Sequence, residues 1–174
     1  MRPKPSRKLN KRITRVWRLS AAINVILWAG IPTIVLLLIA VLIAGSGNLT
    51  SGEKTAVSVL YIIFAICALV FLALLVVFVV IVPKIRWIQW SFEIYEEEID
   101  IHKGIFWHKR IIIPLVRVQN IDTRQGPLLR MMGLSSFTVA TAAGEHEIPG
   151  LETAEADALR DRVAILARIA QEDV

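Results

Sequence analysis

Six basic side chains between residues 102 and 130 are the clearest candidates for chemistry in this sequence, and one acid, Asp122, accompanies them. They are Lys103, Lys109, Arg110, Arg117, Arg124 and Arg130. The surrounding residues 87–174 are acidic overall, because nine basic side chains stand against fourteen acidic ones, a net charge of −5. A basic patch on an acidic domain attracts anionic lipid headgroups or an acidic protein. The six residues are therefore a candidate patch for an anionic ligand.

A structural interpretation of the same residues stays open. Arg117 and Arg130 could pair with Asp122 inside the domain, and the other charges could be solvated surface. The patch exists only if the fold brings its members together, and spacing along the chain does not decide that.

Catalytic and metal-binding patterns are not found in the sequence. His102, His108 and His146 lack the i, i+4 spacing of a zinc helix. Glu96–Glu98 is interpreted as a solvated turn that also protects a sheet edge. The single cysteine, Cys67, excludes an intrachain disulfide and a cysteine cluster. We therefore expect no catalytic residue, no metal, no cofactor and no enzymatic activity.

Short strands and one long helix must position these side chains. Alternation of apolar and polar residues predicts the strands. They are expected at residues 88–94, 98–102, 106–113, 116–124, 136–142 and 145–148. A proline followed by a later glycine predicts a short helix between Pro127 and Gly133.

The last segment, beginning at a Thr153 cap, predicts an amphipathic helix. Its expected apolar face consists of Leu159, Val163, Leu166 and Ala170. About six or seven antiparallel strands closed by such a helix predict a small β-barrel or sandwich. The fold class is therefore α+β.

Two long uncharged stretches precede this domain. Residues 19–52 and 55–83 contain no Asp, Glu, Lys or Arg, and a bilayer core needs about 20 apolar residues. Two such helices in succession leave no polar face for water, and the first is longer than the roughly 7–15 apolar residues of a signal peptide. The expected division is a basic tail 1–18, transmembrane helices 19–44 and 56–83, an external loop 45–55 and a cytoplasmic domain 84–174.

The orientation follows from the basic residues. Residues 1–18 hold eight Lys and Arg side chains and no acid, and such an excess marks the cytoplasmic side of the cell membrane. Both termini are therefore expected inside. Trp17, Trp87 and Trp90 would lie in the headgroup layer at that face, with the domain core as the alternative for Trp90. The proline-containing tail is expected to be disordered. It has no aromatic residue before Trp17, so we expect it not to bind nucleic acid.

The spans themselves carry few polar groups. Pro32 should distort the first helix. Asn24 could hydrogen-bond a neighbouring helix, which leaves association into a homo-oligomer as a possibility. A subunit of a transport or channel assembly is the alternative function. It would need a polar pathway, and the spans offer for it only Asn24, Thr33 and Ser58.

The chain resembles the bacterial membrane-anchored pleckstrin-homology (PH) family of the YdbS-like type. The resemblance rests on the continuous block from Arg117 to Leu134 and on Ile148-Pro149-Gly150-Leu151. A basic start, two spans and a PH-like domain match the family layout as well. The resemblance implies the fold more than the function, because fold does not fix function. We expect a non-enzymatic module at the cytoplasmic face that binds a protein partner and could contact anionic membrane lipids.

Overall fold

The protein is seen in a computed structural model that describes residues 5–47, 50–105 and 107–172. Two compact units make up the chain. One is a helical hairpin, Trp17–Pro83, and the other is a β-rich domain formed by Met1–Val16 together with Lys84–Val174.

Two long helices form the hairpin. The first comprises α1 (Ile13–Val25), a π-helical turn (Ile26–Gly30) and α2 (Ile31–Ala44). The second comprises α3 (Ser51–Leu75), a π-helical turn (Val76–Ile81) and α4 (Val82–Gln89). Both are long and apolar enough to cross a membrane, and only 11% and 0% of their most apolar windows is buried. Core helices of a soluble protein would be mostly buried, so these exposed apolar surfaces favour lipid as the surroundings.

Each π-helical turn stands just before a proline, Pro32 or Pro83. A proline has no N–H to donate to the carbonyl four residues earlier. In the turns, the N–H of Ile31 donates to the carbonyl of Ile26, and the N–H of Val82 donates to the carbonyl of Val77. Each acceptor lies five residues earlier. The distortion expected at Pro32 thus takes the form of a widened helical turn.

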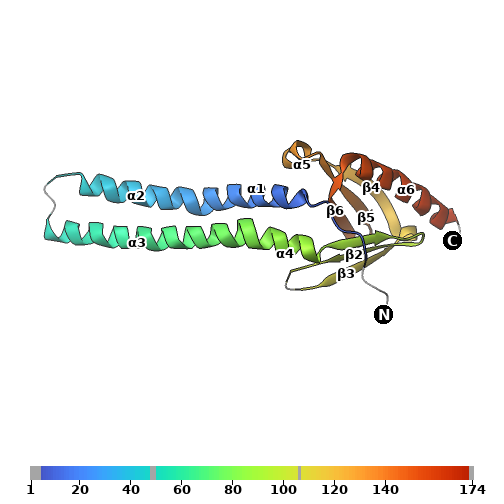
Figure 1. The fold of residues 1–174 in the computed structure, drawn as a ribbon, viewed down its shortest axis with the longest axis horizontal. Coiled ribbons are helices and arrows are strands. Elements are labelled where there is room, and N and C mark those ends of the chain that lie inside the picture. The colour runs from blue at the N-terminus through green and yellow to red at the C-terminus, as the bar shows by residue number, and fades with distance from the viewer. Residues whose placement is uncertain (1–4, 48–49, 106, 173–174) are drawn as a thin grey trace. The chain divides into compact units, whose positions relative to one another are not determined.

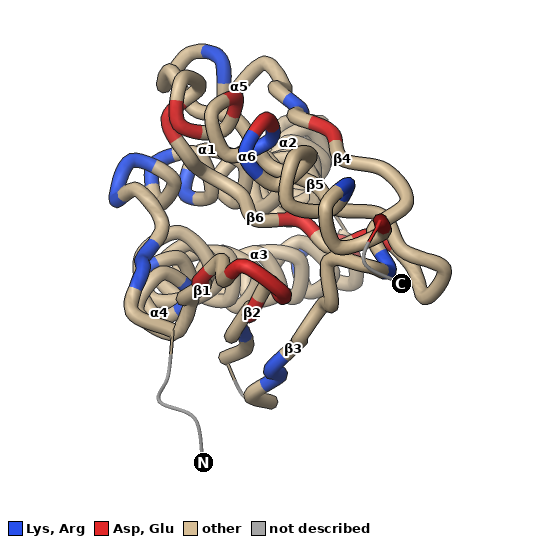
Figure 2. Tube along the Cα trace, turned by 90° about the vertical axis from the view of Figure 1, so that its right-hand side faces the viewer, with Lys and Arg blue, Asp and Glu red and all other residues tan. Residues whose placement is uncertain are grey.

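Two antiparallel three-stranded sheets form the domain. The first contains β1 (Ser91–Ile94), β2 (Glu98–Lys103) and β3 (Lys109–Pro114) in chain order. The second contains β4 (Val118–Arg124), β5 (Leu134–Thr141) and β6 (Gly144–Glu152). Figures 1 and 2 show the sheets on opposite sides of the domain, with α6 (Thr153–Glu172) beside the second sheet. The described strands form no closed barrel, so the fold is a PH-like sandwich.

Alternating residues of both sheets fill the core. Phe92, Ile99 and Ile101 of the first sheet and Phe137 of the second are fully buried. On α6 the buried residues are Ala156, Leu159, Val163 and Ala167. Leu159 and Val163 confirm the expected face, whereas Leu166 and Ala170 lie at its edge and are half-buried.

Some element boundaries differ from the expectation. The strand predicted over residues 88–94 starts only at Ser91, because α4 continues the second long helix to Gln89. A 3-10 turn, Leu115–Arg117, separates β3 from β4, and the predicted short helix is α5 (Pro127–Met131). Trp90 is 3% exposed and belongs to the core. Phe106, the expected start of a strand, lies outside the described residues.

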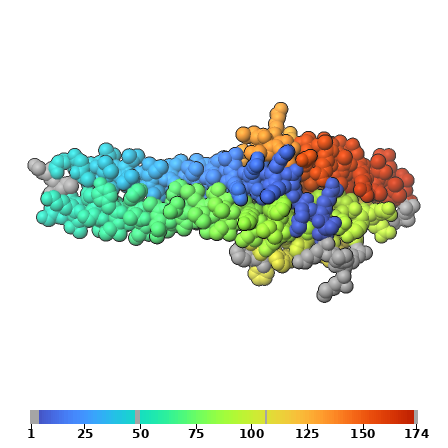
Figure 3. All heavy atoms as spheres, in the orientation of Figure 1, coloured from blue at the N-terminus to red at the C-terminus, as the bar shows by residue number. Residues whose placement is uncertain are grey.

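The N-terminal segment is an integral part of the domain. Residues 5–12, called here the N-terminal strap, cross between the two sheets. The N–H of Phe92 on β1 donates to the Arg7 carbonyl at 2.9 Å, and the N–H of Asn10 donates to the Gly150 carbonyl on β6 at 3.2 Å. Figure 3 shows the strap, in dark blue, between α6 and the first sheet.

Side chains also hold the strap in place, by burial and by hydrogen bonds. Leu9 is 2% exposed and Ile13 is 1% exposed. The Lys8 ammonium donates to the Ile88 carbonyl at 2.7 Å, and the Trp87 indole donates to the Leu9 carbonyl at 2.9 Å. The expectation of a disordered tail is therefore wrong for residues 5–16. Arg2, Pro3 and Lys4 lie outside the described residues.

Candidate functional site

The structure brings three of the six candidate basic residues together on the β2–β3 hairpin. Lys103 pairs with Lys109 across the hairpin, and His102 pairs with Arg110. Because side chains alternate along a strand, Lys103 and Lys109 continue the face that buries Ile101. The two ammonium groups thus extend the inner face of the sheet beyond its apolar core.

Arg110 points to the other face and is occupied. Its guanidinium donates to the Asp100 carboxylate at 2.6 and 3.1 Å, and Asp100 is only 1% exposed. The hydrogen bond to Asp100 raises the pKa of Arg110 above its ordinary value. Arg110 neutralises a buried acid and is not free to bind an external anion.

The remaining arginines lie elsewhere. Arg117 directly precedes β4, and Arg124 is its last residue. The seven residues of β4 extend over about 23 Å, so the two arginines lie at opposite ends of the strand. Arg124 pairs with Glu145 at 3.1 Å, and this hydrogen bond raises its pKa. Arg130 is an exposed residue of α5. The six candidates therefore do not form one continuous patch.

The alternative of internal pairs is not what the structure shows either. Asp122 accepts a hydrogen bond from the Asn120 amide at 3.0 Å. Within the described part of the chain, neither Arg117 nor Arg130 forms an ion pair. Arg117 is thus a guanidinium available to a ligand.

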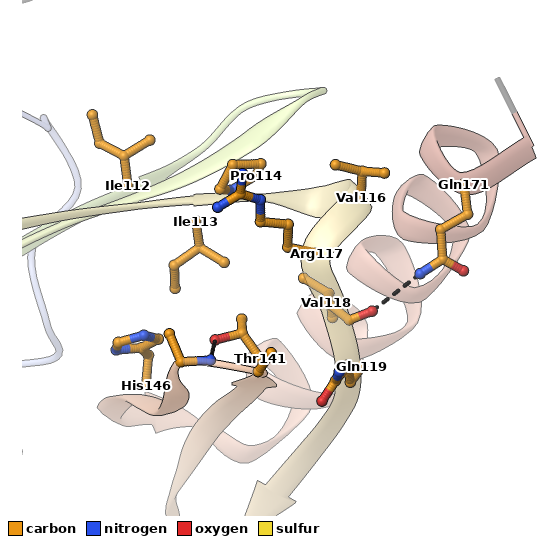
Figure 4. Close-up of a pocket in the computed structure, with 12 residues that line it drawn as sticks. Ile112, Ile113, Pro114, Val116, Arg117, Val118, Gln119, Thr141, His146 and Gln171 are labelled. Carbon is orange, nitrogen blue, oxygen red and sulfur yellow. Dashed lines mark hydrogen bonds between the residues drawn. The ribbon is translucent and has the colours of Figure 1, made fainter. Parts of the chain in front are cut away.

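Arg117 lines a cleft of about 400 Å³, named here the β3–β4 cleft (Figure 4). β3, the 3-10 turn and the start of β4 form one side, and the β5–β6 turn forms the other. The lining residues are Ile112, Ile113, Pro114, Val116, Arg117, Val118, Gln119, Thr141, Ala142, Ala143, His146 and Gln171. The Gln171 amide donates to the Val118 carbonyl at 3.1 Å and fixes the end of α6 at the rim.

The cleft combines apolar and cationic surface. Ile112 is 47% exposed and Val116 is 40% exposed, so both offer apolar surface beside the Arg117 guanidinium. His146 stands on the opposite side, and its pKa is lowered by burial and then by the positive charges of Lys103 and Lys109. β3 ends its sheet, so one row of its backbone groups faces no further strand in the described chain.

Sequence reasoning missed two features. Trp107, at the tip of the β2–β3 hairpin, is 89% exposed, whereas the sequence placed it inside the strand expected over residues 106–113. The strap was missed as well. Its signal was the i, i+4, i+7 spacing of Leu9, Ile13 and Val16.

Among the described residues, no group of three His, Cys, Asp or Glu side chains lies close enough to hold a metal ion. His102 and His108 lie with their ring centroids 5.7 Å apart. Their contact is a ring contact on the hairpin.

Comparison with known proteins gives two matches. A family model described as "Bacterial PH domain" matches residues 19–166. The chain is also 52% identical over 85 residues to the UPF0699 transmembrane protein YdbS of Bacillus subtilis (strain 168), an alignment that covers 49% of this chain and 54% of that protein. The aligned region thus spans about half the length of this curated relative. No solved structure matches the chain.

Proposed function

Because the chain belongs to the bacterial PH domain family, as the resemblance implied, we propose that it is a non-enzymatic membrane-anchored module that binds a protein partner. In this proposal the helical hairpin crosses the cell membrane twice, and the domain lies at the cytoplasmic face. The excess of Lys and Arg in residues 1–18 supports that orientation. The binding surface is the β3–β4 cleft.

One observation carries the proposal: Arg117 stands beside exposed aliphatic side chains and makes no ion pair in the described chain. A planar guanidinium binds a carboxylate through two parallel hydrogen bonds. The apolar residues Ile112 and Val116 provide a surface for neighbouring side chains. This combination fits an extended peptide segment with an acidic side chain or a C-terminal carboxylate.

The edge position of β3 adds a second means of attachment. A peptide laid along an edge strand satisfies its backbone hydrogen bonds there, and pockets select its side chains. The volume of the cleft falls within the range of about 300–1,000 Å³ typical of ligand sites. Anchoring of both proteins in one membrane raises their local concentration, so a weak contact suffices.

A photo-crosslinking amino acid at Ile112 of the full chain, in its native membranes, tests the proposal. We expect one discrete protein adduct that disappears in an Arg117→Glu background and persists with Arg130→Glu, an exposed arginine away from the cleft. The positional control is the same crosslinker at Ile165, which is 63% exposed on α6. Adducts that are confined to lipid, or that ignore Arg117→Glu, would contradict a partner site in the cleft.

A further inference from the structure

Trp107 is the most exposed large apolar side chain in the described part of the chain. Its exposure of 89% means that the indole contacts almost nothing of its own protein. Tryptophan has an apolar body and a polar N–H, and it favours the boundary between lipid and water.

Positive charges flank this tryptophan. Lys103 and Lys109 face one another across the hairpin, and no acid occurs between residues 102 and 110. Neither ammonium forms an ion pair in the described chain, although Lys103 lies 5.9 Å from the ring centre of Trp90. A tryptophan between two unpaired lysines is complementary to an apolar layer beneath anionic headgroups.

The backbone fixes how the tip presents Trp107. Gly104 has φ +132°, a conformation that side chains rarely adopt, and a Cβ atom there would lie 1.8 Å from the Trp107 carbonyl oxygen. Only glycine allows this close approach. The turn is thus tight, and the indole stands outside it.

The hairpin contacts the end of α4 close to its tip. His102 Nδ1 lies 3.4 Å from the Gln89 carbonyl, at the end of α4. Along the chain, Gln89 comes six residues after Pro83, where the second expected span ends. Ser91, the first residue of β1, pairs with His102, and the residues after His102 therefore extend beyond β1 at the end where α4 arrives.

We infer that the tip of the β2–β3 hairpin is an interfacial anchor that inserts Trp107 into an anionic membrane leaflet. Lys103 and Lys109 contact the headgroups in this arrangement. The anchor goes beyond the proposed function, because it uses a different surface and a different partner from the β3–β4 cleft. It leaves the cleft to a protein.

Full-length chain in nanodiscs tests the anchor. A fluorophore is attached to Ile105→Cys in a Cys67→Ala background, and the nanodiscs contain spin-labelled lipid as quencher. We expect strong quenching in discs with phosphatidylglycerol, weaker quenching in pure phosphatidylcholine, and loss of the difference at high salt. Trp107→Ala should reduce the quenching in both.

The charge test compares two double variants. Lys103→Gln with Lys109→Gln should reduce quenching in anionic discs to the neutral level, since each lysine contributes roughly five-fold to binding an anionic surface. The matched control, Arg162→Gln with Arg168→Gln on exposed α6 positions, removes the same charge and should change nothing. Equal quenching in neutral and anionic discs, or burial of the probe only on addition of another protein, would overturn the anchor. The salt dependence of the unsubstituted chain decides the matter even if the lysine variant misfolds.

Discussion

A buried carboxylate is the most demanding single residue of the domain. Asp100 lies on the face of β2 away from the apolar core, yet it is only 1% exposed. The Arg110 guanidinium, which is one third exposed, covers it and supplies its hydrogen bonds. Breaking a buried ion pair costs more than the pair contributes, because the remaining charge is left without a partner.

Arg110→Ala should therefore clearly lower the free energy of unfolding of the domain. The matched variant Arg124→Ala removes an exposed pair with Glu145 and should lower it much less. Chemical denaturation of the detergent-solubilised chain, followed by near-UV circular dichroism, measures both values. Similar losses for the two variants would mean that Asp100 finds other partners or water.

His146 gives the domain a pH dependence. Burial, and then Lys103 and Lys109, lower the pKa of His146 below 6.5 in the folded chain. Between the folded pKa and 6.5 the unfolded state binds more protons, so stability rises with pH there. The contribution is present above about pH 6.5 and is lost as the pH falls through the folded pKa.

His146→Gln should accordingly flatten the fall in melting temperature between about pH 7 and pH 5. The comparison is His108→Gln, which removes an exposed imidazole of the hairpin. Thermal melts of the full chain over this pH range give the measurement. An unchanged slope in His146→Gln would show that other groups, not this imidazole, set the acid response.

At the scale of elements, the N-terminal strap connects the two sheets by hydrogen bonds to one strand of each. It pairs with β1 through Arg7 and with β6 through Asn10. Its charges match the domain, since Arg7 forms an ion pair with Glu155 and Arg12 approaches Glu152 at 3.9 Å. The segment before the first span thus folds with a domain that begins about 70 residues later.

Gly150 lies directly against Ile13 of this N-terminal segment. Its φ is +70°, and a Cβ atom there would lie 2.5 Å from the Cβ of Ile13. Gly133 has a similar φ of +66° but open space around the same position. Gly133→Ala should cost about 1–2 kcal/mol for backbone strain alone, and Gly150→Ala should cost clearly more. Equal losses of unfolding free energy in the two variants would show that Ile13 does not press on Gly150.

At the scale of the whole molecule, the question is where the domain lies relative to the membrane. Met131 is 73% exposed on α5, and Ser51 is exposed at the start of α3. In a Cys67→Ala background, Met131→Cys should react with an impermeant maleimide only after the cells are opened. Ser51→Cys should react in intact cells, because the loop 45–55 is proposed to be external. Labelling of Met131→Cys from outside would invert the proposed orientation.

The predictable part of the molecule is the part set by neighbours in the chain. The two long apolar helices follow from runs without charge, and β2, β5, α5 and α6 follow from local periodicity or from Pro127 and Gly133. Even there, β1 starts three residues later than its alternation predicts, because α4 continues to Gln89.

The partners of the six basic side chains could not be predicted in the same way. Their sequence alone determined that positive charge is concentrated between residues 102 and 130 in an acidic domain. Only the tertiary structure decided that Arg110 covers Asp100, that Arg124 meets Glu145, and that Arg117 lines a cleft. Hydropathy and period act over a few residues, whereas the partner of a charge depends on which strands become neighbours. The strap shows the same limit, since Arg7 finds Glu155 across 148 positions of sequence.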